Sequence, residues 1–228
     1  MKFSEEVESK LKEYADLKLL EMFGYEDSIG IRLPILRKYA KELSKEYELD
    51  FLIENINENY HEEILLKGFL IGLYKNLKWE ELEKYIRYYV DRITTWDLCD
   101  CFCSSLKITK KYEKEMWNLI QEYLKSDKEF YVRFALVMIL SYYINDEYID
   151  RIFKIIQDVK LDKYYTKMAN AWLISYCVIK EYDKTLEFLK EDTKIDKWTF
   201  NKGIQKSIES FRVTDEHKEE LKKLRKRN

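Results

Sequence analysis

Apolar residues recur three and four positions apart along almost the whole chain, which is the spacing of one face of an α-helix. Short polar breaks such as Asp127-Lys128, Asn145-Asp146 and Thr214-Asp215 separate these stretches. The breaks come too often for long coiled coils, so the pattern predicts a succession of helices of ordinary length. They are expected at residues 3–22, 34–47, 50–57, 60–75, 78–91, 95–107, 112–125, 128–143, 146–158, 163–180, 182–190, 197–211 and 214–226.

Composition supports an all-α fold. The chain of 228 residues has 5 Gly and 1 Pro, too few turn residues for a β-sandwich, a propeller or a glycine-rich nucleotide loop. Its apolar fraction of 46% is ample for a core at this length and excludes disorder for most of the chain.

An aromatic residue returns near the start of successive expected helices. Spacings of 36, 35, 34 and 35 residues separate Tyr60, Trp96, Tyr131, Tyr165 and Phe200. Such a period indicates helix pairs stacked side by side, and the missing Gly, Ala and Pro positions favour HEAT-like pairs over tetratricopeptide repeats. No linker rich in Pro, Gly or Ser interrupts the pattern. We therefore predict an α-α superhelix (solenoid) of about six HEAT-like repeats, forming a single domain over residues 1–228.

In a solenoid the inner helices line a concave groove, so equivalent positions form a ladder along it. Two places after the aromatic residue, the last three repeats carry Arg133, Lys167 and Lys202. Cations neutralise phosphates and rings pack against sugars or bases, so this ladder suits a nucleic-acid-binding groove. Core packing is the alternative interpretation for most of the aromatic side chains.

Charge is unevenly distributed along the chain. The formal net charge is −2, which argues against indiscriminate nucleic-acid binding. Residues 1–29 nevertheless carry a net charge of −4 and residues 200–228 a net charge of +4. The basic end at residues 222–227 is expected to be either a solvated chain end or a phosphate-facing tail.

The chain shows neither a membrane segment nor a disulfide framework. No apolar run reaches about 18 residues, and the first residues carry acids where a signal peptide needs a basic and then an apolar stretch. We expect a cytoplasmic protein with reduced thiols. Cys99, Cys101 and Cys103 point apart on a helix, and no His cluster completes a metal site, so no metal is expected.

The sequence lacks several common catalytic and nucleotide-binding motifs. The chain has no G-x-G-x-x-G, P-loop or H-E-x-x-H motif, and its only imidazoles are His61, expected at a helix start as a surface or cap residue, and His217. The informative pair is Trp96 and Asp100, which share a helix face because they are four residues apart. Arg133, on the next inner helix, is placed to pair with Asp100 and keep it ionised. A catalytic carboxylate and a structural salt bridge between repeats both fit this arrangement.

Five ordered blocks resemble the AlkD family of HEAT-like repeat DNA glycosylases, the bacterial DNA alkylation repair enzymes. These blocks are residues 29–38, 95–100, 132–135, 164–172 and 201–206. The resemblance implies excision of purines alkylated at N3 or N7 from double-stranded DNA. It assigns the active-site carboxylate to Asp100, the tryptophans that flank the lesion's sugar to Trp96 and Trp172, and the arginine that holds the carboxylate to Arg133.

The resemblance also implies a monofunctional enzyme that does not extrude the base and needs no metal or organic cofactor. An alkylated purine carries a positive charge and is a good leaving group, so Asp100 need only stabilise an oxocarbenium-like sugar and position water. Phosphate contacts are expected from basic residues in the matching blocks or on the concave side, namely Lys167, Lys202, Lys206, Arg37 and Lys38. We expect a monomer.

Two other functions fit the same sequence. A non-catalytic repeat protein would bind branched or damaged DNA and release no base. A HEAT-type protein scaffold would grip a helix or peptide with the aromatic ladder and would bind no DNA even at low salt.

Overall fold

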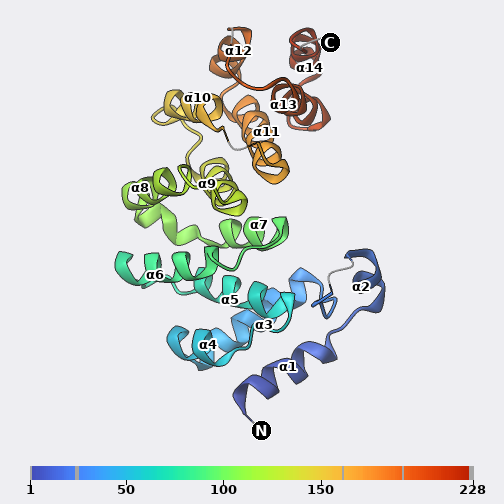
Figure 1. Ribbon diagram of the computed structural model, residues 1–228, viewed down its shortest axis with the longest axis vertical. Helices are drawn as coiled ribbons and strands as arrows, with labels where there is room; N and C mark the ends of the chain where they lie inside the picture. Colours follow the sequence, from blue (N-terminus) through green and yellow to red (C-terminus); the bar gives the residue numbers. More distant parts are fainter. Residues whose placement is uncertain (1, 24–25, 161, 192, 226–228) are drawn as a thin grey trace. The chain divides into compact units, whose positions relative to one another are not determined.

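The computed structural model describes residues 2–23, 26–160, 162–191 and 193–225 of the protein, and most of the residues in these ranges are helical (Figure 1). Within these ranges there are 14 α-helices, one 3₁₀ helix and no strand, which confirms the all-α prediction. In order these are α1 (Phe3–Glu13), α2 (Leu17–Phe23), α3 (Leu33–Glu46), α4 (Leu49–Asn55), α5 (His61–Leu73), α6 (Trp79–Val90), α7 (Trp96–Ser105), the 3₁₀ helix η1 (Lys107–Lys111), α8 (Glu113–Tyr123), α9 (Glu129–Tyr142), α10 (Ile149–Asp158), α11 (Tyr164–Lys180), α12 (Tyr182–Lys190), α13 (Lys197–Glu209) and α14 (Asp215–Lys223).

The helices form two compact units, unit 1 at residues 1–112 and unit 2 at residues 113–228. In unit 1, α5 packs against both α3 and α7. In unit 2, α11 packs against α9 and α13, and α8, α12 and α14 pack on these inner helices. Each unit therefore stacks helix pairs at the predicted period. A single repeat domain with one groove along its whole length stays a prediction.

Inner and outer helices differ in how they bury side chains. The inner helix α5 is buried on nearly every side, with Leu65, Leu66 and Phe69 each at most 3% exposed. The outer helix α10 buries one face, through Ile149, Ile152 and Ile156 at helical spacing. Each such side chain contributes about 1.5–3 kcal/mol when fully buried. Helix α5 thus contributes to the core on nearly all of its sides, whereas α10 contributes one face.

The structure differs from the predicted helix at residues 3–22, which is broken between α1 and α2. The carboxylate of Asp16 accepts hydrogen bonds from the Arg32 guanidinium at 2.8 and 3.0 Å. The backbone N–H of Asp16 donates to the carbonyl of Gly30 at 2.7 Å, and Gly30 takes a φ of +80°. Because these partners are distant in sequence, the helical periodicity of residues 3–22 alone does not reveal the break between α1 and α2. The short helix η1 was likewise not predicted.

Candidate functional site

The predicted pair Trp96 and Asp100 lies on α7. Trp96 opens the helix and is 42% exposed, while Asp100 follows one turn later and is half-buried. The opposite side of α7 buries Leu98, Cys99 and Phe102 completely. The core therefore anchors α7 on one side, and the indole and the carboxylate lie on the other, less buried side of the same helix.

A hydrogen-bonded pair joins the starts of α5 and α7, at the residue that follows Trp96. The Nε2 of His61, the first residue of α5, lies 2.6 Å from Oδ2 of Asp97. The Thr95 hydroxyl donates to Oδ1 of Asp97 at 2.6 Å. Burial works to raise the pKa of Asp97, but the hydrogen bonds from His61 and Thr95 outweigh it and hold that pKa below its ordinary value. His61 does open a helix, but its side chain is 10% exposed and joins α5 to α7 rather than facing solvent.

A pocket of about 380 Å³ lies beside Trp96 and is bounded by His61, Asp97, the loop at residues 28–32 and the start of α3. The buried carboxylate of Glu62 holds this loop. It accepts hydrogen bonds from the backbone N–H groups of Ile29 and Gly30, both at 2.8 Å. Sequence reasoning missed Glu62, because its partners precede it by more than 30 residues and share no periodicity with it.

Unit 2 contains the other two residues of the predicted catalytic set. Arg133 is 4% exposed on α9, and its Nη1 donates to the carbonyl of Tyr165 at 3.0 Å. Trp172 is half-buried on α11 with its ring 5.7 Å from that of Tyr176 in an edge-on contact. The pairing of Arg133 with Asp100, and the two tryptophans around one sugar, join residues of different units and stay predictions.

The basic residues predicted to contact phosphate in unit 2 differ in their surroundings. Lys167 Nζ lies 3.0 Å from Asp162 and 3.2 Å from Asp196, and the hydrogen bond to Asp162 contributes most to raising its pKa. Lys202 Nζ lies 3.4 Å from the side-chain oxygen of Gln205. Lys206 is half-buried on the same helix, α13. Lys167 must therefore exchange its carboxylate partners for a phosphate in order to bind one.

The predicted phosphate contacts of unit 1 lie on α3. Arg37 is exposed and donates to the hydroxyls of Ser105 at 3.1 Å and Ser104 at 3.4 Å. Lys38 is 80% exposed, with Glu42 at 3.9 Å. Of the basic end of the chain, residues 226 and 227 lie outside the described residues.

The cysteines of α7 are free thiols. Cys99 and Cys103 are buried, and burial raises the pKa of Cys101 to about 11. A thiol with such a pKa stays protonated and is a poor nucleophile at neutral pH. Over the described ranges, no group of three His, Cys, Asp or Glu side chains is arranged to hold a metal ion. In the same ranges, no helix is long and apolar enough to cross a membrane.

The fold and the residues on α7 define a class: an all-helical protein of stacked helix pairs that presents an indole and a carboxylate on an inner helix. The chain belongs to the DNA alkylation repair enzyme family, whose model matches residues 8–225. The match spans both units, so Asp100 and Arg133 both fall inside it. No curated protein and no solved structure gives a significant match. Membership of this family supports a role in DNA repair.

Proposed function

We propose that the protein is a DNA glycosylase that hydrolyses the N-glycosidic bond of purines alkylated at N3 or N7. The observation that carries this proposal is the pair on α7. Trp96 is 42% exposed next to the half-buried Asp100, whereas a tryptophan used only for packing would be largely covered. An exposed indole beside a carboxylate, in a chain of the DNA alkylation repair enzyme family, suits recognition of a sugar that becomes cationic.

In the proposed reaction the protein does not have to protonate the departing base. Alkylation at N3 or N7 gives the purine a positive charge, so it departs as a neutral base without a general acid. Positive charge then develops on the deoxyribose, where the Asp100 carboxylate stabilises it and orients the attacking water. Trp96 and Trp172 would add cation–π attraction to the same sugar. Arg133 would keep Asp100 ionised.

The product of this reaction is an abasic site in an intact strand. The proposal uses no lysine as a Schiff-base nucleophile, so strand cleavage is not expected. It needs no extrusion of the base into a pocket, and no metal or organic cofactor. We further propose that the protein acts as a cytoplasmic monomer on double-stranded DNA.

Replacing Asp100 by Asn tests the role of the carboxylate, because the amide keeps the shape and loses the charge. Release of alkylated base should fall by about 10²–10³-fold, the usual cost of removing one electrostatic contact to a transition state. Affinity for the same duplex should stay within about twofold. Asp127→Asn, at an exposed carboxylate between α8 and α9, is the matched control and should release base at the parent rate. Equal rates in Asp100→Asn and the parent would show that the assigned mechanism is wrong.

A further inference from the structure

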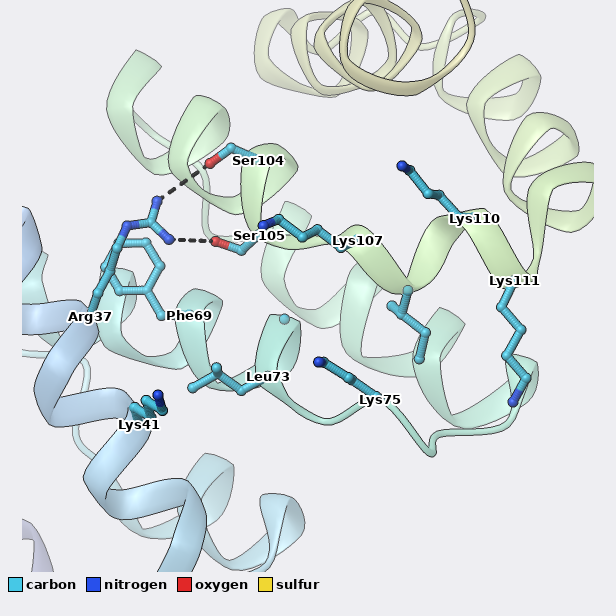
Figure 2. A pocket seen from close by; sticks show the side chains of 12 residues that line it. Arg37, Lys41, Phe69, Leu73, Lys75, Ser104, Ser105, Lys107, Lys110 and Lys111 are labelled. Carbon is cyan, nitrogen blue, oxygen red and sulfur yellow. Dashed lines mark hydrogen bonds between the residues drawn. The ribbon is translucent and has the colours of Figure 1, made fainter.

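A strongly basic pocket lies in unit 1 at the C-terminal ends of α5 and α7 (Figure 2). Its volume is about 780 Å³, and none of the residues that line it is acidic. Six cationic side chains surround it: Arg37, Lys41, Lys75, Lys107, Lys110 and Lys111. We call this the basic pocket. Only Arg37 among these six was expected from the sequence to contact phosphate.

The ends of α5 and α7 and the side chain of Arg37 are closely packed at the basic pocket. At Gly72 a Cβ atom would lie 2.6 Å from the carbonyl oxygen of Ser105, so the ends of α5 and α7 are in direct contact. Arg37 stacks over the buried ring of Phe69 with its guanidinium carbon 4.0 Å from the ring centre. The hydroxyls of Ser104 and Ser105 accept from Arg37 while donating to the carbonyl of Cys101. Arg37 thus has neutral hydroxyl groups as its hydrogen-bond partners in the basic pocket (Figure 2).

Among the described residues, the lysines of the basic pocket differ from several lysines outside it, which do have a carboxylate partner. Lys10, Lys67 and Lys184 each lie within 2.7 Å of a carboxylate oxygen. By contrast, in the part of the chain that the structure describes, no ion pair joins a carboxylate to any of the five pocket lysines. The overall net charge is −2, so this local excess of positive charge is not a reflection of composition. A concentration of like charge in a hollow attracts an anion.

The shape of the basic pocket favours an extended polyanion over a compact phosphate group. A compact phosphate is commonly held by backbone N–H groups at a helix N-terminus. Here α5 and α7 offer their C-terminal ends, whose carbonyl dipoles repel anions, so attraction comes from the side chains alone. These side chains come from α3, from the segment after α5 and from η1, so they are spread around the opening (Figure 2).

We propose that the basic pocket binds the sugar-phosphate backbone of DNA, at phosphates beside those nearest the target nucleotide. The inference rests on the proposed function for one point, that the target nucleotide lies at Asp100. Asp100 and Ser105 share α7, which sets them about 7.5 Å apart along the helix axis. A duplex that reaches Asp100 would therefore bring backbone phosphates to the pocket. The pocket offers no exposed aromatic ring to stack on a base, because Phe69 is 3% exposed, so binding there is independent of sequence.

The salt dependence of DNA binding tests the proposal. The variant Lys107→Gln, Lys110→Gln, Lys111→Gln removes the three lysines of η1. The control Lys10→Gln, Lys12→Gln, Lys84→Gln changes the charge of unit 1 equally, at lysines that each have a carboxylate partner. Affinity for an undamaged duplex is measured by fluorescence anisotropy between about 50 and 200 mM salt, the range over which phosphate contacts change affinity most clearly.

Each phosphate contact contributes about 0.9 to the slope of log affinity against log salt, so the η1 variant should lose about 2.7 from that slope. Its affinity deficit would then be about 40-fold larger at the lower salt than at the higher. Lys41→Gln, Lys75→Gln, on other elements around the pocket, should lose about 1.8 from the slope. Both variants should melt at the temperature of the parent. A slope equal to that of the control in both variants would overturn the proposal.

Two further results separate this proposal from other interpretations. The readout is affinity for undamaged DNA, so absence of base release by the parent would refute the proposed glycosylase and leave the slope comparison intact. Titration with inorganic triphosphate tests for a site for small anions. Tight one-to-one binding by the parent that is lost in the η1 variant, with no change in the slope for DNA, would show a site for free polyphosphate and overturn DNA backbone binding.

Discussion

The buried carboxylate of Glu62 should be the main support of the loop beside Trp96. Glu62 is 3% exposed and accepts hydrogen bonds from the N–H groups of Ile29, Gly30 and Ile31 at 2.8, 2.8 and 3.2 Å. The Ser28 hydroxyl adds a fourth at 2.7 Å. Replacing Glu62 by Ala would remove the acceptor of the Ile29 and Ile31 N–H groups, and would leave the Gly30 N–H with the Ser28 hydroxyl alone, at 3.2 Å.

The cost follows from the number of donors. A buried donor left unsatisfied costs about 1–3 kcal/mol. Two such N–H groups, those of Ile29 and Ile31, would cost more than water can recover by entering the neighbouring pocket, so we expect Glu62→Ala to lower the free energy of unfolding by about 2–5 kcal/mol. Glu62→Gln keeps one oxygen and turns an amide N–H towards a backbone N–H, so it should cost about 1–2 kcal/mol.

Urea unfolding followed by circular dichroism gives the free energies, and hydrogen exchange reports the loop directly. Amides 29–31 should exchange faster in both variants, with Glu62→Ala the faster of the two. Glu46→Gln replaces an exposed carboxylate on α3 and should stay within about 0.5 kcal/mol of the parent. The reasoning is refuted if Glu62→Ala unfolds at the same urea concentration as Glu46→Gln and the protection of these amides is unchanged.

Three further predictions concern unit 1. Gly30→Ala should lower the free energy of unfolding by about 1–3 kcal/mol in a urea titration. The backbone φ of Gly30 is +80°, and the new Cβ would lie 2.7 Å from the carbonyl oxygen of Asp16. An unchanged urea midpoint of unfolding would contradict this prediction. Burial opposes ionisation of Glu58, but hydrogen bonds, of which that from Lys67 is the strongest, lower the pKa of Glu58 from 4.5 to about 2. The ionised carboxylate therefore stabilises the fold above pH 4.5, and this stabilisation is lost as the pH falls towards 2. Because Glu58 is 30% exposed, the parent should lose about 1–2 kcal/mol more than Glu58→Gln across this range, and parallel pH profiles would exclude the effect. Trp96→Ala should slow base release about 10-fold, because the cation–π attraction to the sugar is lost. The melting temperature of the variant should shift little, because the indole is 42% exposed. An unchanged single-turnover rate would contradict the assignment of Trp96 to the sugar.

Features that depend on local spacing were predictable from the sequence. The apolar period located the helices, and Tyr60, Trp96, Tyr131, Tyr165 and Phe200 do lie at or near the starts of α5, α7, α9, α11 and α13. Spacing of four residues was enough to put Trp96 and Asp100 on one helix. Periodicity reports which side of a helix is apolar, and that information is contained within a few turns.

Features that depend on contacts between distant segments were not predictable. The break before α2 needs Arg32 and Gly30, and the burial of His61 needs Asp97, which lies 36 residues away. The basic pocket collects lysines from three segments, which the packing of α5 against both α3 and α7 brings together. A lysine in the sequence gives no sign of whether a carboxylate will lie beside it in the fold.

Release of N7-methylguanine from a defined duplex, under single-turnover conditions at low salt, tests the central claim most directly. The account predicts first-order release by the parent, an abasic site in an uncut strand, and loss of release in Asp100→Asn with duplex affinity retained. If the parent binds the duplex and releases neither N7-methylguanine nor N3-methyladenine, the protein is not a glycosylase for these lesions. Tighter binding to a branched junction than to linear duplex would then identify it as a DNA-binding repeat protein without excision activity.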